Sequence, residues 1–354
     1  MSSPAPTLRL RRPVGAMLAV IAAVVLSACA PGADPASATT TASAAAASQA
    51  APTSGQFPVT VEHVYGQTVI PAEPQRVITL GLSDQDPLLA LGVKPVAVYP
   101  WWGDYPYATW PWAQDELGDA QPVVLNKGVR DEANPPVEEI ASLEPDLIIS
   151  LYNGTTKEQY EQLSQIAPVV VPDEQYANFA ITWQEATRAT GEALGREAEA
   201  VALVEQLERS FADAAEAHPE FAGKTAVVAE RFEAGETIVR TGNDVRAKFF
   251  EQLGFTIPTE VAGIAPNAYG ELYVPDELVT ELSKDLLVWN VGFAPDARAT
   301  VEALPLYGQL PVVQDQRVLW VEDPVVSGAF SWGTVLSLQY ALDELLPQVS
   351  ETLS

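Results

Sequence analysis

Few residue combinations in this sequence could carry out catalysis. Ser331 lies in Ala329–Gly333, a degenerate form of the G-x-S-x-G turn that presents a nucleophilic serine. That chemistry needs a histidine after the serine in the chain, and both histidines of the sequence come before it. The neighbouring carboxylates Glu138 and Glu139 point about 100° apart on a helix, so they do not converge on one atom. The sequence therefore predicts a protein that is not an enzyme.

Metal and nucleotide sites are equally poorly supported. The chain has one cysteine and two histidines, His63 and His218, which lie far apart in the sequence. This inventory allows no intramolecular disulfide and no cysteine zinc site. No G-x-G-x-x-G segment follows a strand and no Walker sequence is present, so a phosphate cradle is missing. We expect neither a cofactor nor a metal bound directly by the protein.

Aromatic and arginine side chains follow several of the expected strands, where they could bind an organic ligand. Trp101 and Trp102 stand in the richest segment, directly after a short apolar run. In open α/β sheets ligands bind beyond the carboxyl ends of strands, and aromatic rings supply rigid apolar area with a polar handle. Because some of these side chains will only pack in a core, we expect about half of them to contact a ligand. The candidate ligand-binding residues are Tyr99, Trp101, Trp102, Tyr105, Tyr152, Arg231, Arg240, Trp289, Phe330 and Trp332.

The N-terminus has the pattern of an export signal that ends at the only cysteine. Arginines at positions 9, 11 and 12 precede the apolar stretch Val14–Leu26, which is shorter than the ~20 residues that a spanning helix needs. Leu26–Cys29 resembles the lipobox of bacterial lipoproteins, in which the thiol accepts the lipid. We expect residues 1–28 to be removed and Cys29 to be lipidated, on the extracytoplasmic face of the cell membrane. An ordinary secretory signal with a chance cysteine is the alternative.

Composition separates a tether from a globular part. Residues 29–56 are rich in Ala, Ser and Thr and have almost no large apolar side chains, so we expect a flexible tether. The chain of 354 residues is 47% hydrophobic and carries a formal net charge of −28. It is long enough for two domains, and its charge disfavours nucleic acid and anionic membrane surfaces as partners.

From Phe57 onward, short apolar strands alternate with helices, which is typical of parallel sheets covered on both faces. We expect an N-terminal lobe over 57–175, a helical connector over 176–221 and a C-terminal lobe over 222–354. The connector contains the long helix Glu197–Ala217, with an interruption near Gly191 or Gly195 before it. The fold class is therefore α/β, with two Rossmann-like lobes joined by one long helix. The strands are expected at Arg76–Leu80, Val96–Tyr99, Asp146–Ser150, Val169–Val171, Thr225–Ala229, Thr237–Val239, Leu286–Trp289 and Arg317–Val321.

Several segments together resemble the siderophore- and cobalamin-binding proteins of bacterial ABC importers. Pro136–Ile149 is similar to their "n-x-E-x-I-x-x-L-x-P-D-L-I-I" signature. Arg76–Ile78, Leu89–Val93 and Ala341–Pro347 also match, so that the resemblance covers roughly residues 57–347. It implies two α/β lobes with a ligand cleft between them. It also implies a monomer that captures a ferric siderophore, which itself holds the iron, and delivers it to ABC permease subunits.

The charge of the ligand follows from the few cations in the two halves. The N-terminal half offers chiefly Lys127 and Arg130, and the C-terminal half offers Arg231, Arg240 and Arg246. A triply charged ferric catecholate would need a cluster of cations, so a neutral or weakly charged ferric hydroxamate is favoured. Catecholate or mixed siderophores, cobalamin and haem remain alternatives, as does a lipid-anchored interaction or signalling protein without a ligand.

The resemblance also implies two docking residues for the permease, one glutamate on each lobe. Glu138 holds the glutamate of the family signature. Glu277 holds the second, in a segment where Pro275 replaces the usual serine. Both are expected in the first turn of a helix, where a carboxylate also stabilises the helix dipole, so a purely structural role is the alternative.

Overall fold

The computed structural model describes residue 55 and residues 57–131, 134–232, 235–242, 244–294 and 296–354. The predicted signal peptide, Cys29 and nearly all of the predicted tether lie outside the described residues. All of the described residues belong to one compact unit. None of the described helices is long and apolar enough to cross a membrane.

The N-terminal lobe is built on a parallel sheet with the strand order β5-β4-β3-β6-β7. Every neighbouring pair of strands is parallel, as predicted, although the edge strand β5 was not among the predicted strands. The strands are β3 (Val77–Thr79), β4 (Ala97–Val98), β5 (Val123–Val124), β6 (Leu147–Ile149) and β7 (Val169–Val170). The helices are α1 (Gln85–Ala90), α2 (Gln114–Leu117), α3 (Val137–Ser142) and α4 (Lys157–Leu163), with short 3-10 helices η1 (Pro106–Ala108), η2 (Pro111–Ala113) and η3 (Leu125–Gly128).

An antiparallel hairpin precedes this sheet and was not predicted. It consists of β1 (Val59–His63) and β2 (Gly66–Ile70), paired along their full length. Its side chains alternate between buried and exposed, so it lacks the continuous apolar run by which the other strands were found.

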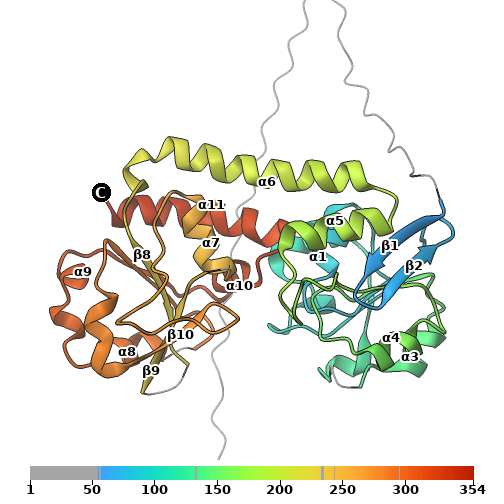
Figure 1. Ribbon diagram of the computed structural model, residues 1–354, viewed down its shortest axis with the longest axis horizontal. Coiled ribbons are helices and arrows are strands. Elements are labelled where there is room, and N and C mark those ends of the chain that lie inside the picture. Colours follow the sequence, from blue (N-terminus) through green and yellow to red (C-terminus); the bar gives the residue numbers. More distant parts are fainter. Residues whose placement is uncertain (1–54, 56, 132–133, 233–234, 243, 295) are drawn as a thin grey trace, which may run out of the picture. The chain divides into compact units, whose positions relative to one another are not determined.

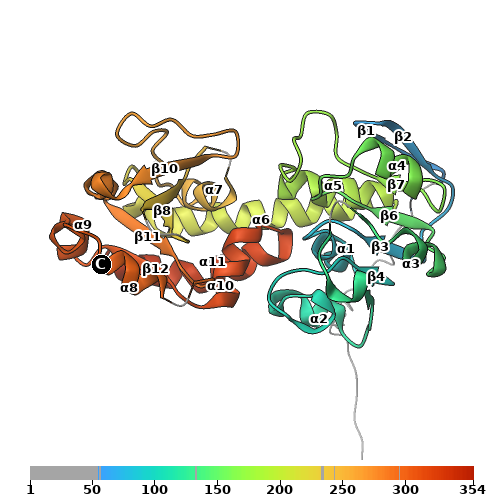
Figure 2. The same ribbon diagram turned by 90° about the horizontal axis from the view of Figure 1, so that it is seen from below.

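Two helices connect the lobes, and their break falls where the sequence predicted it. Helix α5 (Trp183–Ala193) ends before Gly195, which has the left-handed φ of 64°, and α6 (Glu197–Ala217) begins two residues later. Figures 1 and 2 show α6 extending from one sheet-containing lobe to the other. The buried stripe of α6 consists of Ala200, Val204, Leu207, Phe211 and Ala214.

The C-terminal lobe has a mixed sheet, which corrects the expectation of a parallel one. Its order is β10-β9-β8-β11-β12; β8, β11 and β12 are parallel, whereas β9 is antiparallel to both of its neighbours. Residues 231–235 alone connect β8 to β9, and a parallel crossover needs about a dozen residues or more. The strands are β8 (Ala226–Glu230), β9 (Glu236–Arg240), β10 (Glu271–Pro275), β11 (Leu286–Asn290) and β12 (Val318–Val321).

The helices of this lobe include two that reach the junction between the lobes. Helix α10 ends at Trp332, and α11 begins at Val335 after the left-handed Gly333. Helix α11 packs against α6 and also against α1 of the other lobe. The helices are α7 (Val245–Gln252), α8 (Ala297–Glu302), α9 (Pro311–Gln314), α10 (Pro324–Trp332) and α11 (Val335–Thr352), with 3-10 helices η4 (Pro219–Phe221), η5 (Asp276–Leu282) and η6 (Tyr307–Gln309).

Candidate ligand-binding site at the lobe junction

The loop that follows β4 supplies most of the aromatic side chains at the junction. Trp101 is buried and makes edge contacts with Trp110 and Trp112, at centroid distances of 6.0 and 6.1 Å. Trp110 and Trp112 stack on each other at 4.7 Å. Tyr105, half-buried, lies 4.7 Å from Trp110. The loop is therefore a packed aromatic platform at the carboxyl end of a central strand, where α/β proteins bind ligands.

Trp332, at the end of α10, extends this platform from the opposite lobe. Its ring meets Trp101 edge-on at 5.4 Å and stacks on Trp102 at 5.2 Å with an interplanar angle of 22°. Trp102 remains 42% exposed, and the guanidinium of Arg130 lies 3.5 Å over its ring. Arg130 forms no ion pair with any described residue. A cation over an aromatic face is held in place without losing its charge, so Arg130 can still bind an anionic or oxygen-rich group.

Several indole N–H groups of this platform are buried without an acceptor. The Nε1 atoms of Trp101, Trp110 and Trp332 have no hydrogen-bond partner among the described residues. A buried donor without a partner costs about 1–3 kcal/mol, so the packing of the platform leaves polar groups unpaired.

A close contact between α10 and Trp110 brings the two lobes together. A Cβ atom at Gly328 would lie 2.4 Å from Cζ3 of Trp110, so only glycine allows the indole to approach the helix this closely. The Trp110 ring also makes an edge contact with the ring of Phe293, at a centroid distance of 6.5 Å.

Asp86, at the start of α1, makes a second contact between the lobes. Its Oδ2 accepts hydrogen bonds from Trp112 Nε1 at 2.8 Å and from the hydroxyl of Thr334 at 2.6 Å. Thr334 is the N-cap of α11 in the other lobe. Burial, together with the nearby Glu116 charge, raises the pKa of Asp86 to about 7, although both hydrogen bonds act in the opposite direction.

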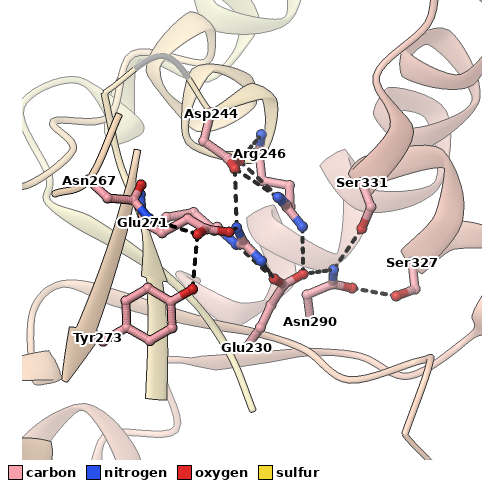
Figure 3. Close-up of polar contacts among 10 residues, drawn as sticks. Glu230, Asp244, Arg246, Asn267, Glu271, Tyr273, Asn290, Ser327 and Ser331 are labelled. Atoms are coloured by element: carbon pink, nitrogen blue, oxygen red, sulfur yellow. Dashed lines mark hydrogen bonds and ion pairs between the residues drawn. The ribbon is translucent and has the colours of Figure 1, made fainter. Parts of the chain in front are cut away.

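The C-terminal lobe contributes a buried polar network, which we call the arginine cluster. It consists of Glu230, Arg240, Asp244, Arg246 and Glu271 (Figure 3). The two oxygens of Glu230 accept from different arginines: Oε2 from Nε of Arg240 at 2.7 Å, and Oε1 from Nη1 of Arg246 at 2.8 Å. Glu230 stands at the carboxyl end of β8 and is fully buried, so these contacts compensate the cost of burying its charge.

Asn290 links the arginine cluster to α10. Its amide nitrogen donates to Glu230 at 2.6 Å and to Ser331 at 2.9 Å, and its oxygen accepts from the Ser327 hydroxyl (Figure 3). Ser331 therefore serves in a structural hydrogen bond next to Trp332. The cluster and the aromatic platform are parts of one junction.

The ionisation of the cluster is set by its ion pairs. Burial alone would raise the pKa of Asp244, but Arg246 and Arg240 outweigh it and leave that pKa below its usual value. For Arg246, burial opposes the charge, but Glu230 and Asp244 prevail and raise the pKa above its ordinary value. The cluster thus holds two cations and three carboxylates, an excess of one negative charge.

Tyr152 lies in the N-terminal lobe, within range of the charges of this cluster. It follows β6, and its backbone N–H donates to Oδ1 of Asp84 at 2.9 Å. Burial raises the pKa of the Tyr152 hydroxyl, and the charges of Arg246, Asp244 and Arg240 also act on it. These charges come from the other lobe, so Tyr152 lies across the junction from the cluster.

A small hollow, with room for about one water molecule, opens where β3, β4 and β6 end. It lies on the same side of the sheet as Tyr99 and the loop that carries Arg130. Its lining residues are Leu80, Tyr99, Asp131, Pro135, Asn153, Thr155, Gln159 and Leu163.

Three of the predicted ligand residues lie away from this junction surface. Trp289 and Phe330 are fully buried, Trp289 against Trp320 and Phe330 among core phenylalanines. The guanidinium of Arg231 is buried in an ion pair with Asp276, at 2.6 Å. These three side chains therefore have a structural role within the lobe, which is the alternative to ligand contact. Arg240 is near the junction, but its side chain is committed to the arginine cluster.

Several residues of the junction were absent from the predicted site. Arg130 was counted only as a cation; its place beside a tryptophan depends on a loop that returns from β5. Asp86, Arg246 and Asn290 gave a weaker signal, namely polar residues beside apolar runs. Among the described residues, no group of three or more His, Cys, Asp or Glu side chains could hold a metal ion.

Two α/β lobes with an aromatic and polar junction at the strand ends define a solute-binding protein. The comparisons agree. A family model described as "Periplasmic binding protein" matches residues 77–323, and the chain belongs to that family. This is a family of binding proteins and not of enzymes, as the sequence predicted.

Known relatives cover most of the chain. "Probable siderophore-binding lipoprotein YfiY" of Bacillus subtilis is 28% identical over 298 residues, 81% of this chain and 86% of the relative. The crystal structure of a periplasmic solute-binding protein from Mycobacterium smegmatis is 33% identical, with a TM-score of 0.74 and coverage of 84% of this chain and 99% of that one. Streptococcus pneumoniae PiaA in complex with ferrichrome is 22% identical with a TM-score of 0.68, covering 83% and 98%, and supports the fold alone.

Proposed function

We propose that this protein captures a ferric siderophore, with the hydroxamate type favoured, and delivers it to an ABC permease for iron uptake. One observation carries the proposal: Arg130, Trp102 and Trp332 form a continuous stack across the lobe junction, beside buried indole donors. Such a surface suits a bulky complex with an apolar periphery and several oxygen acceptors. The relative named for a siderophore, YfiY of Bacillus subtilis, supports the same ligand class.

Within this site we assign ligand contact to Trp101, Trp102, Trp332, Arg130 and Tyr152. Trp102 and Arg130 are the exposed members, so they meet the ligand first. A single exposed cation fits a neutral or weakly charged complex better than a triply charged one. Tyr99 and Tyr105 are additional candidates for ligand contact. Tyr99 lines the small hollow, and Tyr105 lies beside Trp110.

Titration of the protein with a ferric trihydroxamate, followed by tryptophan fluorescence, tests this assignment. Trp102→Ala should weaken binding by about thirtyfold, since truncating an aromatic anchor commonly costs about 2 kcal/mol. Arg130→Gln should weaken it as well, whereas Arg209→Gln, on the exposed face of α6, serves as the control. Unchanged affinity in both junction variants would remove this surface from the site.

The same titration, together with mass spectrometry, distinguishes the alternative ligands from one another and from a protein without a ligand. Mass spectrometry of the ligand that co-purifies from iron-starved source cells identifies a siderophore, a cobalamin or a haem directly. A protein that shows no quenching with any of these classes would instead be a lipid-anchored interaction or signalling protein.

The anchor is part of the proposal, and Cys29 carries it. Lipidated proteins need two or more acyl chains for stable membrane attachment, at about 0.8 kcal/mol per buried methylene. Cys29→Ala should therefore move the protein from the membrane fraction to the soluble fraction. Equal membrane retention of both proteins would contradict the anchor.

A further inference from the structure

The arginine cluster has a charge balance that bears on which ligands the site accepts. Arg240 donates from all three guanidinium nitrogens: Nε and Nη2 to Glu230, and Nη1 to Oε1 of Glu271 at 2.5 Å. Arg246 is equally committed, to Asp244 through Nε and Nη2 and to Glu230 through Nη1. Every nitrogen of both guanidinium groups therefore already donates to a carboxylate of the cluster.

Glu271 is the carboxylate at the edge of the cluster, and its charge gives the cluster one more carboxylate than it has arginines. It lies on the edge strand β10, and its side chain is 21% exposed, whereas Glu230 is fully buried between both arginines. Its second oxygen accepts from Asn267 and from the hydroxyl of Tyr273, each at 3.0 Å (Figure 3). Although burial opposes ionisation, these hydrogen bonds and Arg240 keep the pKa of Glu271 below its usual value.

The charges of the arginine cluster act on the part of the junction where the ligand contacts are proposed. Its charges reach Tyr152 across the junction, and Asn290 joins Glu230 to Ser331, the neighbour of Trp332. A charge in this partly desolvated space is screened less than one at the surface.

We infer that Glu271 is a specificity residue, which withholds the Arg240 guanidinium from the ligand and leaves the C-terminal side of the site with an excess negative charge. Polyanionic ferric complexes are thereby rejected, and neutral or weakly charged ones are accepted. This inference rests on the proposed siderophore-binding function.

The test compares two ligands in four proteins. The association constants of a ferric trihydroxamate and of a triply charged ferric tricatecholate are measured for the wild type, Glu271→Gln, Glu271→Asp and Glu302→Gln. In Glu271→Gln the ratio of the tricatecholate constant to the trihydroxamate constant should rise by about tenfold or more, because one negative charge is lost and a neutral amide oxygen holds Arg240 less strongly than a carboxylate does. Glu271→Asp keeps the charge and should keep the wild-type ratio.

Glu302→Gln is the matched control, because it removes the same charge and likewise weakens an arginine–carboxylate pair, that of Glu302 with Arg298 at 3.0 Å on α8, while Arg298 keeps its pair with Glu322. It should leave both constants unchanged. An equal rise in this control, or an unchanged ratio in Glu271→Gln, overturns the inference. Failure of the wild type to bind either complex overturns the proposed function instead.

A salt series on the wild type gives a second measurement that does not depend on the folding of a variant. Screening of the negative excess should raise the affinity for the tricatecholate relative to the trihydroxamate as sodium chloride increases. A relative fall would mean that the site attracts polyanions, and would also overturn the inference.

Discussion

Among single residues, Asp86 has the environment with the clearest consequence for stability. Its pKa is raised from 3.8 to about 7, chiefly by burial. A raised pKa means that the folded protein holds this proton more tightly than the unfolded chain. The resulting stability is fully present below pH ~4 and is lost as the pH rises through about 7.

Asp86→Asn removes this titration and keeps one oxygen to accept from Thr334 and Trp112. Relative to the wild type, the variant should gain about 2 to 3 kcal/mol in free energy of unfolding between pH 5 and pH 8. Urea denaturation at the two pH values measures the gain. Parallel pH dependence of the two proteins would show that Asp86 is ionised in the folded state throughout this range.

The sequence could predict the role of a junction residue only where the place of that residue directly after a strand was sufficient. Trp102 follows a strand, and its place after that strand was enough to mark it as a candidate. Glu230 and Arg231 are neighbours at the end of β8, and strand geometry sends successive side chains to opposite faces. Glu230 therefore reaches the arginine cluster, while Arg231 reaches Asp276 on η5. The sequence does not say which face looks toward the other lobe, so it could not predict which member of this pair joins the arginine cluster.

At the scale of elements, α10 combines helix formation with a contact between the lobes. Gly328 is in the middle of this helix, where alanine would ordinarily be preferred by about 1 kcal/mol. The indole of Trp110 occupies the space of its missing side chain.

Gly328→Ala should therefore destabilise the protein, by about 1 to 3 kcal/mol, since overpacking outweighs the gain in helix propensity. Gly308→Ala in η6 is the matched control, because a Cβ there would meet nothing within 4 Å. Chemical denaturation compares the three proteins. A Gly328→Ala variant as stable as the wild type would mean that Trp110 moves aside at no cost.

Local patterns predicted the elements unevenly, and the reason is physical. The bounds of α6 agree with the prediction because a long apolar stripe and a glycine break define it. The antiparallel strand β10 was not predicted, since Glu271–Pro275 alternates in burial and has no long apolar run. Glu277 was expected in the first turn of a helix, and Asp276–Leu282 is a helix of the 3-10 type, which depends on hydrogen bonds rather than on apolar spacing.

At the scale of the whole molecule, the two proposed docking glutamates lie one in each lobe. Glu138 is in the first turn of α3 and Glu277 in the first turn of η5, and both are exposed. Neither takes part in an ion pair or a side-chain hydrogen bond with another described residue. By contrast, the adjacent Glu139 accepts from the backbone N–H of Asn126 at 2.8 Å. Exposed carboxylates without internal partners are free to pair with cations of a permease.

Two charges on separate lobes can fix the orientation of a binding protein on a two-subunit permease, because interfacial charge pairs act strongly on encounter rate and register. The double variant Glu138→Ala, Glu277→Ala should leave siderophore affinity unchanged and lower the melting temperature by only a few degrees, since each carboxylate contributes about 0.3 to 1 kcal/mol to its helix end. Uptake of the radiolabelled ferric complex by cells should nevertheless collapse. Glu158→Ala with Glu161→Ala, on the exposed face of α4, removes the same charge and should leave uptake intact. Normal uptake by the docking variant would reject this pair, whereas a large fall in melting temperature would assign the two glutamates to helix stabilisation instead.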